Sequence, residues 1–213
     1  MQAVDKIVQT NDWVTLLFLI LFSGIVVLKL MNPKKVKENF FAFFRFTIIE
    51  DEDLEGVSFF KGFQLLIFMF SVLVFSFLVY QFKLYKLPQT KTGLTVFLSI
   101  LAYVLLYFIA KRILEYALLL LFVIKNRIQF FVYLKNSYLY SVSFLLYIAL
   151  ILFEYAALGK QYLLIFAVFL FVLRYVFLIA RNKKLIFNKL FYFILYICAL
   201  EIAPLFVAFK LMF

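Results

Sequence analysis

A single carboxylate and a single proline interrupt the last apolar stretch of the sequence, residues 190–213. They are Glu201 and, three residues later, Pro204. A charged side chain at the centre of a membrane helix costs about 2.5 to 3.5 kcal/mol on insertion scales, so Glu201 needs a partner. Pro204 has no backbone N–H to donate to the carbonyl of Leu200, so we expect a helix kink that leaves a further polar group beside the carboxylate.

The predicted partner of Glu201 is Arg174, which lies in the preceding apolar stretch, residues 161–180. At about 1.5 Å per residue, the two side chains start roughly 10 and 16 Å from the same membrane surface, an offset that arginine can span. Antiparallel neighbours joined by a short loop pack side by side, so we predict an intramembrane Arg174–Glu201 ion pair. Two roles remain open for it: fixing the register of two helices, or titrating or binding a cation along a pathway.

A run of acidic residues between two apolar stretches is the second candidate site. It imitates the first half of an EF-hand calcium loop, but the twelfth position is Gly62, where the loop needs a bidentate glutamate. We therefore predict a solvated acidic loop that faces basic loops or docks on a basic partner. Its carboxylates are those of Glu50, Asp51, Glu52, Asp53 and Glu55.

The composition removes most enzymatic chemistry. The 213 residues include no histidine and one cysteine, Cys198. Without histidine, neither a serine triad nor the common zinc motifs can form, and one cysteine gives neither an intramolecular disulfide nor a thiolate metal site. All aspartates lie outside the apolar stretches, so no intramembrane aspartyl dyad is available. We predict no enzymatic activity, no metal site and no cofactor.

The same composition indicates a membrane protein. Hydrophobic residues make up 68% of the chain and charged residues 15%, against about 45–50% and 25% in ordinary soluble domains. We predict an all-α, polytopic helical membrane protein in a single domain, residues 1–213, with about six transmembrane helices and one or two interfacial amphipathic helices. The predicted spans are residues 13–31, 58–82, 94–110, 137–157, 161–180 and 190–213, and the interfacial segments are 34–49 and 113–134.

The segment 113–134 is long enough to cross a membrane. We prefer a third helix that runs past the interface and then an interfacial segment, because Lys125 and Arg127 would otherwise place two cations inside a span. Nearby, Glu115 follows Lys111 and Arg112 at helical spacing, which predicts a local ion pair.

Aromatic residues dominate the apolar stretches, with 32 Phe against 5 Gly, and no GxxxG pair is present. We therefore expect bulky aromatic contacts between the helices. Trp13, Tyr138 and Tyr140 are predicted to anchor their helices at the membrane interfaces. Glu154 is predicted to lie near the outer interface, solvated by lipid headgroups.

The net charge of +11 is explained by basic loops between apolar spans, which excludes nucleic acid as a partner and favours membrane lipid. Loops on one side carry thirteen Lys and Arg residues and the other side six, so the richer side is predicted to be cytoplasmic, with both termini periplasmic. The richer set is Lys34, Lys35, Lys37, Arg45, Lys111, Arg112, Lys125, Arg127, Lys135, Arg181, Lys183, Lys184 and Lys189; the other set is Lys6, Lys83, Lys86, Lys91, Lys160 and Lys210.

The segment YICALEIAPL, residues 196–205, together with the trailing KLMF, resembles the ending of a family of small integral membrane proteins of Bacteroidota, classed as a domain of unknown function. The general plan, with a first helix near the N-terminus and basic loops, is similar over most of the chain. The resemblance implies a protein of the bacterial inner membrane and carries over no activity.

Two functions are compatible with these features. The first is a non-catalytic membrane subunit, scaffold or anchor within a larger envelope complex such as a secretion, motility or assembly machine, with other membrane or envelope proteins, or further copies of the chain, as partners. The second is a small transporter or channel in which Arg174 and Glu201 line a path. The second function requires a water-accessible cavity that reaches both side chains.

Overall fold

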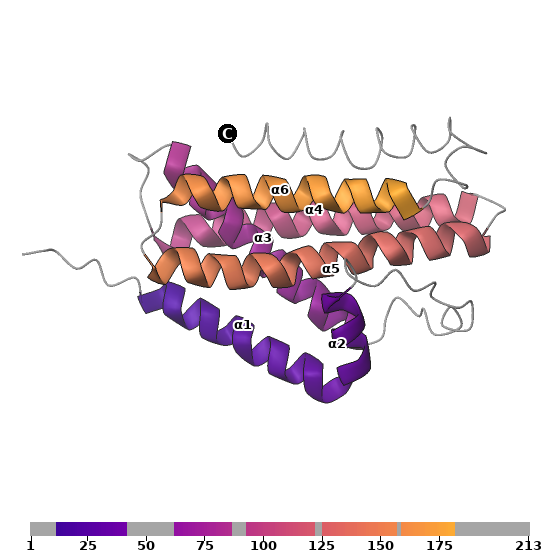
Figure 1. Cartoon of the computed structure of the whole chain (residues 1–213), viewed down its shortest axis with the longest axis horizontal. Coiled ribbons are helices and arrows are strands. Elements are labelled where there is room, and N and C mark those ends of the chain that lie inside the picture. Colours follow the sequence, from indigo (N-terminus) through magenta and orange to yellow (C-terminus); the bar gives the residue numbers. More distant parts are fainter. Residues whose placement is uncertain (1–11, 42–61, 87–92, 122–124, 157–158, 182–213) are drawn as a thin grey trace, which may run out of the picture.

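The computed structural model describes residues 12–41, 62–86, 93–121, 125–156 and 159–181. Every regular element in these ranges is a helix, in agreement with the predicted all-α class. The elements are α1 (Asp12–Met31), α2 (Pro33–Phe40), α3 (Gly62–Lys86), α4 (Leu94–Leu121), α5 (Lys125–Tyr155) and α6 (Lys160–Arg181). Figure 1 shows α4, α5 and α6 running lengthwise together, while α1 slants away from them and continues into α2.

Five of these helices contain a stretch that is long and apolar enough to cross a membrane. The stretches are Asp12–Met31, Gly62–Lys86, Leu94–Glu115, Leu134–Tyr155 and Gln161–Leu178. Each overlaps one of the first five predicted spans, which is compatible with a multi-pass membrane protein. The sixth predicted span, residues 190–213, lies outside the described residues.

The two segments predicted to be interfacial differ in structure. Residues 33–40 form α2, whereas most of the remainder of segment 34–49 lies outside the described residues. Segment 113–134 is not a separate helix: α4 extends past Ala110 to Leu121, as expected, and α5 begins at Lys125 and continues through the fourth span. Whether these helix ends leave the bilayer stays a prediction.

The interior is formed around α3 and α5. The most apolar windows of these two helices are 56% and 67% buried, against 28% for those of α1, α4 and α6. Aromatic side chains fill the contacts, as the Phe-rich composition predicts: Phe75 stacks on Phe108 of α4 at 5.6 Å between ring centroids, and Phe70 lies 5.1 Å from Phe144 of α5. The first pair is stacked and the second is tilted, and ring pairs at such separations add to the stability gained from burial.

Trp13 joins this core. Its indole ring lies 5.3 Å from the ring of Tyr80 and 5.4 Å from that of Phe97. The ring, whose position at a membrane interface stays a prediction, packs between the start of α1, the end of α3 and the start of α4, and it ties the three helices together at one end of the bundle.

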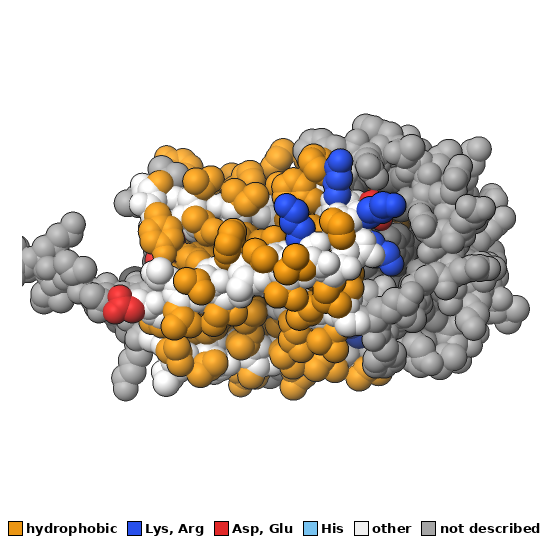
Figure 2. All heavy atoms as spheres, turned by 90° about the horizontal axis from the view of Figure 1, so that it is seen from below, with side chains coloured by type: hydrophobic (Ala, Val, Ile, Leu, Met, Phe, Trp, Pro, Cys, Tyr) orange, Lys and Arg blue, Asp and Glu red, His pale blue; other side chains and the backbone are white. Residues whose placement is uncertain are grey.

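The outer surface is apolar. On α1, large hydrophobic side chains such as Leu19, Phe22 and Leu30 are 61–79% exposed. In Figure 2 hydrophobic side chains cover much of the visible face, and the Lys and Arg side chains gather toward one end. Such a face suits contact with lipid, because lipid tails are as apolar as these side chains and keep them away from water.

The short helix α2 is fixed to the bundle by polar contacts. Asn32 caps its first turn by accepting a hydrogen bond from the backbone N–H of Lys35 at 3.2 Å, and Pro33 occupies the first helical turn, where its missing N–H is harmless. At the other end, Ser137 of α5 donates to Oδ1 of Asn39 at 2.8 Å, and Ser141 donates to the carbonyl of Phe40 at 2.9 Å. These contacts hold α2 firmly against α5.

Candidate functional site

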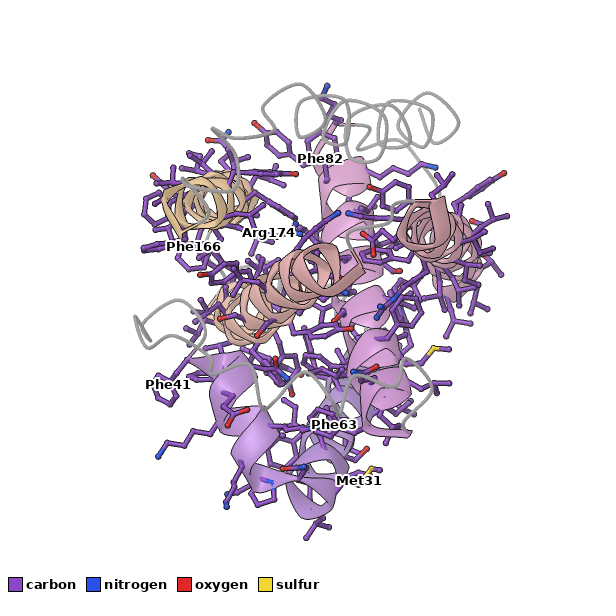
Figure 3. All side chains as sticks on the ribbon, turned by 90° about the vertical axis from the view of Figure 1, so that its right-hand side faces the viewer. Met31, Phe41, Phe63, Phe82, Phe166 and Arg174 are labelled. Atoms are coloured by element: carbon purple, nitrogen blue, oxygen red, sulfur yellow. The ribbon has the colours of Figure 1, made fainter. Side chains whose placement is uncertain are left out.

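Arg174 is the predicted site residue that the structure describes, and it lies inside the bundle. Only 3% of the residue is exposed. Figure 3 shows its side chain pointing from α6 toward the other helices, while Phe166 lies on the outer side of the same helix. Its predicted partner Glu201, the predicted kink at Pro204 and the acidic run 50–55 all lie outside the described residues, so these features stay predictions.

The side chain of Arg174 lines a small cavity between four helices. Its other walls come from Phe68 of α3, from Phe108, Lys111, Arg112 and Glu115 of α4, and from Asn136, Leu139 and Tyr140 of α5. The space available to the centre of a water molecule is about 10 Å³, which is room for about one water. Lys111, Arg112 and Asn136 are half-buried, whereas Glu115, Tyr140 and Arg174 are buried, so the cavity has a polar mouth and a polar floor.

Arg112 is held at the mouth by two neighbouring helices. Its Nη2 donates to the hydroxyl of Tyr140 on α5 at 2.8 Å, and its guanidinium lies 5.5 Å from the centre of the Phe68 ring on α3. A guanidinium over a ring face is attracted by the ring quadrupole. The two contacts fix the orientation of the fork of N–H donors.

A buried ion pair lies beside the cavity. Nζ of Lys135 on α5 lies 2.8 Å from Oε1 of Glu115 on α4, and these side chains are 1% and 5% exposed. The sequence predicted a local partner for Glu115 on its own helix; the structure adds a partner from another helix, because Lys135 of α5 reaches the same carboxylate. Lys135, which was counted as a loop cation, is therefore an interior residue.

The tyrosines of α5 also differ from expectation. Tyr138 and Tyr140 were predicted to anchor the helix at a membrane interface, yet they are only 2% and 6% exposed. They are buried because α5 is an inner helix, surrounded by α2, α3, α4 and α6. The hydroxyl of Tyr140 binds Arg112 instead of water or lipid headgroups.

Glu154 lies toward the other end of α5 and has a partner inside the protein. Nε2 of Gln81 on α3 donates to its Oε2 at 2.8 Å. Glu154 is half-buried, so the expectation of a headgroup-solvated carboxylate is modified by a contact between two helices. Among the described residues, no group of three or more His, Cys, Asp or Glu side chains could hold a metal ion.

Three of these features were not found from the sequence: the Lys135–Glu115 pair, the Arg112–Tyr140 contact and the buried position of Gln81. Spacing along one helix gives local partners, but these pairs join different helices, and their geometry depends on how the helices rotate against one another. One signal was present: Glu115 and Lys135 both lie within long apolar sequence, where an uncompensated charge is costly.

These features define a helical bundle with several apolar spans and a basic polar cluster buried among them. Residues 14–212 match the family described as Domain of unknown function (DUF4271). Because the match covers nearly the whole chain, the protein belongs to this family. No curated protein and no solved structure matches the chain.

Proposed function

We propose that the protein is a non-catalytic subunit, scaffold or anchor of a larger envelope complex in the inner membrane of a bacterium of the Bacteroidota. The observation that supports this most is the aromatic packing between the described helices. The cavity at Arg174 accommodates about one water, and aromatic side chains pack the core formed by α3 and its neighbours. A core of closely packed aromatic side chains suits a part that positions other proteins.

The end of the bundle that carries α2 is suited to docking. Its contacts with α5 hold α2 in a fixed place, and α2 exposes Lys34 and Lys37. The acidic run 50–55 follows α2 in the sequence, and we propose that it docks on a basic surface of the partner. We propose another membrane or envelope protein as that partner, in a complex that can also hold further copies of the chain.

Affinity purification of the tagged full chain from native membranes in mild detergent tests this proposal. We expect a second protein in a fixed ratio, lost or strongly reduced when the acidic run is neutralised by Glu50→Gln, Asp51→Asn, Glu52→Gln, Asp53→Asn and Glu55→Gln. Asp12→Asn is the matched control, because Asp12 is an exposed acid at the start of α1. Recovery of the chain without a stoichiometric companion would contradict the proposal.

A second candidate is a small transporter or channel in which Arg174 and Glu201 line a path. The burial of Arg174 beside a polar cavity favours it. It predicts ion flux across proteoliposomes that contain the purified protein, abolished by Arg174→Gln and unchanged by Lys34→Gln. If proteoliposomes are no more permeable to protons, chloride and phosphate than empty vesicles, the transporter or channel candidate is excluded. The proposal of a non-catalytic subunit then remains.

A further inference from the structure

We propose that the corner between α1 and α2, residues 29–41, binds the headgroups of anionic phospholipids at the membrane surface. The corner consists of the last turn of α1, Asn32, the helix α2 and its C-cap Phe41. This inference concerns the lipid around the protein and does not depend on the proposed role as a subunit.

The first reason is an excess of positive charge at the corner. Within nine residues the sequence places four lysines and one acid, Glu38, a net charge of +3. The lysines are Lys29, Lys34, Lys35 and Lys37. None of these side chains forms an ion pair with another residue in the described part of the chain. A cluster of this kind beside a transmembrane helix attracts anionic lipid, because the negative surface potential of the leaflet favours each added cation.

The second reason is the direction in which α2 presents its lysines. Lys34, Lys37 and Phe41 are exposed and recur at spacings of three and four residues, so they share one face of the helix. The opposite face lies against the bundle, where Asn39 is buried and accepts a hydrogen bond from Ser137 of α5. Figure 3 shows Phe41 pointing away from the bundle. The contacts with α5 therefore hold the two lysines outward, toward the surrounding lipid.

The third reason is the depth of α2. The apolar stretch of α5 begins at Leu134, and the serines that hold α2, Ser137 and Ser141, follow it by three and seven residues. At 1.5 Å per residue they lie about 5 and 10 Å below the end of that stretch, which is the depth of an amphipathic helix in the interface. In Figure 1, α2 also turns across the lengthwise direction of α4, α5 and α6. From this depth the long stem of a lysine brings its ammonium group up to the headgroups.

The fourth reason is the apolar border of the lysines. Leu30 and Met31 follow Lys29 in the last turn of α1, and they are 79% and 50% exposed. In Figure 2, which views the bundle from the side of α1, Lys and Arg side chains gather toward the end at which α1 meets α2, next to a hydrophobic surface. Exposed apolar side chains beside exposed lysines suit the boundary between acyl chains and headgroups, because each kind of group finds its own environment there.

Native mass spectrometry of the purified full chain tests the site. The protein is titrated with phosphatidylglycerol and, separately, with zwitterionic phosphatidylcholine. We expect selective retention of phosphatidylglycerol and about thirtyfold weaker retention by the double variant Lys34→Gln/Lys37→Gln, since each lysine near an anionic surface contributes about fivefold. The charge-preserving variant Lys34→Arg/Lys37→Arg should retain the lipid as the wild type does. Both lysines are exposed, so these substitutions remove no packing contact of the bundle.

The matched control is Lys83→Gln/Lys86→Gln, which removes two lysines from the last turn of α3 and should leave retention unchanged. The variant with the neutralised acidic run should also retain phosphatidylglycerol, even where it loses the proposed partner, so the lipid site and the partner site can fail separately. Equal retention of the two lipids by the wild type, or equal losses in the two double glutamine variants, would overturn the proposal.

Discussion

Lys135 and Glu115 form a buried ion pair that joins α5 to α4, with 2.8 Å between Nζ and Oε1. They are twenty residues apart in the sequence and lie on either side of the connection between the two helices. Each charge is tolerated in the interior because the other compensates it. We expect the pair to set the register of α4 against α5, and Glu115 lines the same cavity as Arg112 and Arg174.

Breaking this pair should destabilise the bundle. We expect Glu115→Leu or Lys135→Met alone to lower the free energy of unfolding by about 3 to 5 kcal/mol, because each leaves an uncompensated buried charge. The double variant should recover most of the loss. The measurement is reversible unfolding in detergent micelles, analysed as a double-mutant cycle. Lys29→Met, at an exposed position of α1, is the control; single variants as stable as the control would show that the pair has no such role.

The predicted Arg174–Glu201 pair can be tested by a second cycle. If the two side chains interact, Arg174→Leu and Glu201→Leu should be non-additive, with a coupling of about 0.5 to 3 kcal/mol in unfolding free energy. Arg174→Leu combined with Glu154→Leu is the comparison, because Glu154 binds Gln81 instead. Additive effects in both cycles would remove Glu201 as the partner of Arg174.

The all-helical class followed from the sequence because its apolar stretches have the length of membrane-spanning helices, and five described helices have that length and apolar character. The approximate spans followed from their length and from polar breaks such as Asn32–Pro33, where the structure separates α1 from α2. The contacts between side chains of different helices could not be predicted from the sequence. Glu115 faces Lys135, and Tyr140 faces Arg112, because of the rotation of α4 against α5. That rotation is set by many aromatic contacts at once, and a spacing rule within one helix contains no information about it.

The attachment of α2 should depend on Ser137. Replacing it with alanine leaves the buried Oδ1 of Asn39 without its donor, which costs about 1 to 3 kcal/mol. Hydrogen–deuterium exchange should then accelerate in α2 and remain unchanged in α3. Ser99→Ala is a matched control, because Ser99 is exposed and donates only to a carbonyl of its own helix, that of Val96. Equal exchange in both variants would mean that α2 is held by other contacts.

The aromatic core should respond to the loss of Phe77. This side chain is fully buried between Trp13, Phe18 and Tyr80. Phe77→Ala should lower the unfolding free energy by up to about 3 kcal/mol, the lower end of the range for buried Phe in soluble proteins, because lipid removes much of the hydrophobic transfer contribution. Phe22→Ala, at a residue 61% exposed on α1, should have little effect. A larger loss of unfolding free energy in Phe22→Ala than in Phe77→Ala would contradict the packing described.

The predicted orientation can be read from cysteine labelling in a Cys198→Ser background. Lys37→Cys in α2 should react with a membrane-impermeant maleimide only after the inner membrane is opened, since the basic side is predicted to be cytoplasmic. Lys86→Cys, at the exposed end of α3, should react from the periplasm in intact inner membranes. The opposite pattern would invert the topology and place the cavity at Arg174 toward the periplasmic side.

The most direct test of the proposed role is the mass of the assembly released from native membranes. Native mass spectrometry of the tagged protein, ejected from membrane vesicles without prior detergent exchange, should give a particle that contains the 25.3 kDa chain and a second protein in a constant ratio. Neutralising the acidic run should reduce that particle to the chain with its lipids. A wild-type particle that contains only this chain and lipid, in repeated preparations, would contradict a subunit of a larger complex.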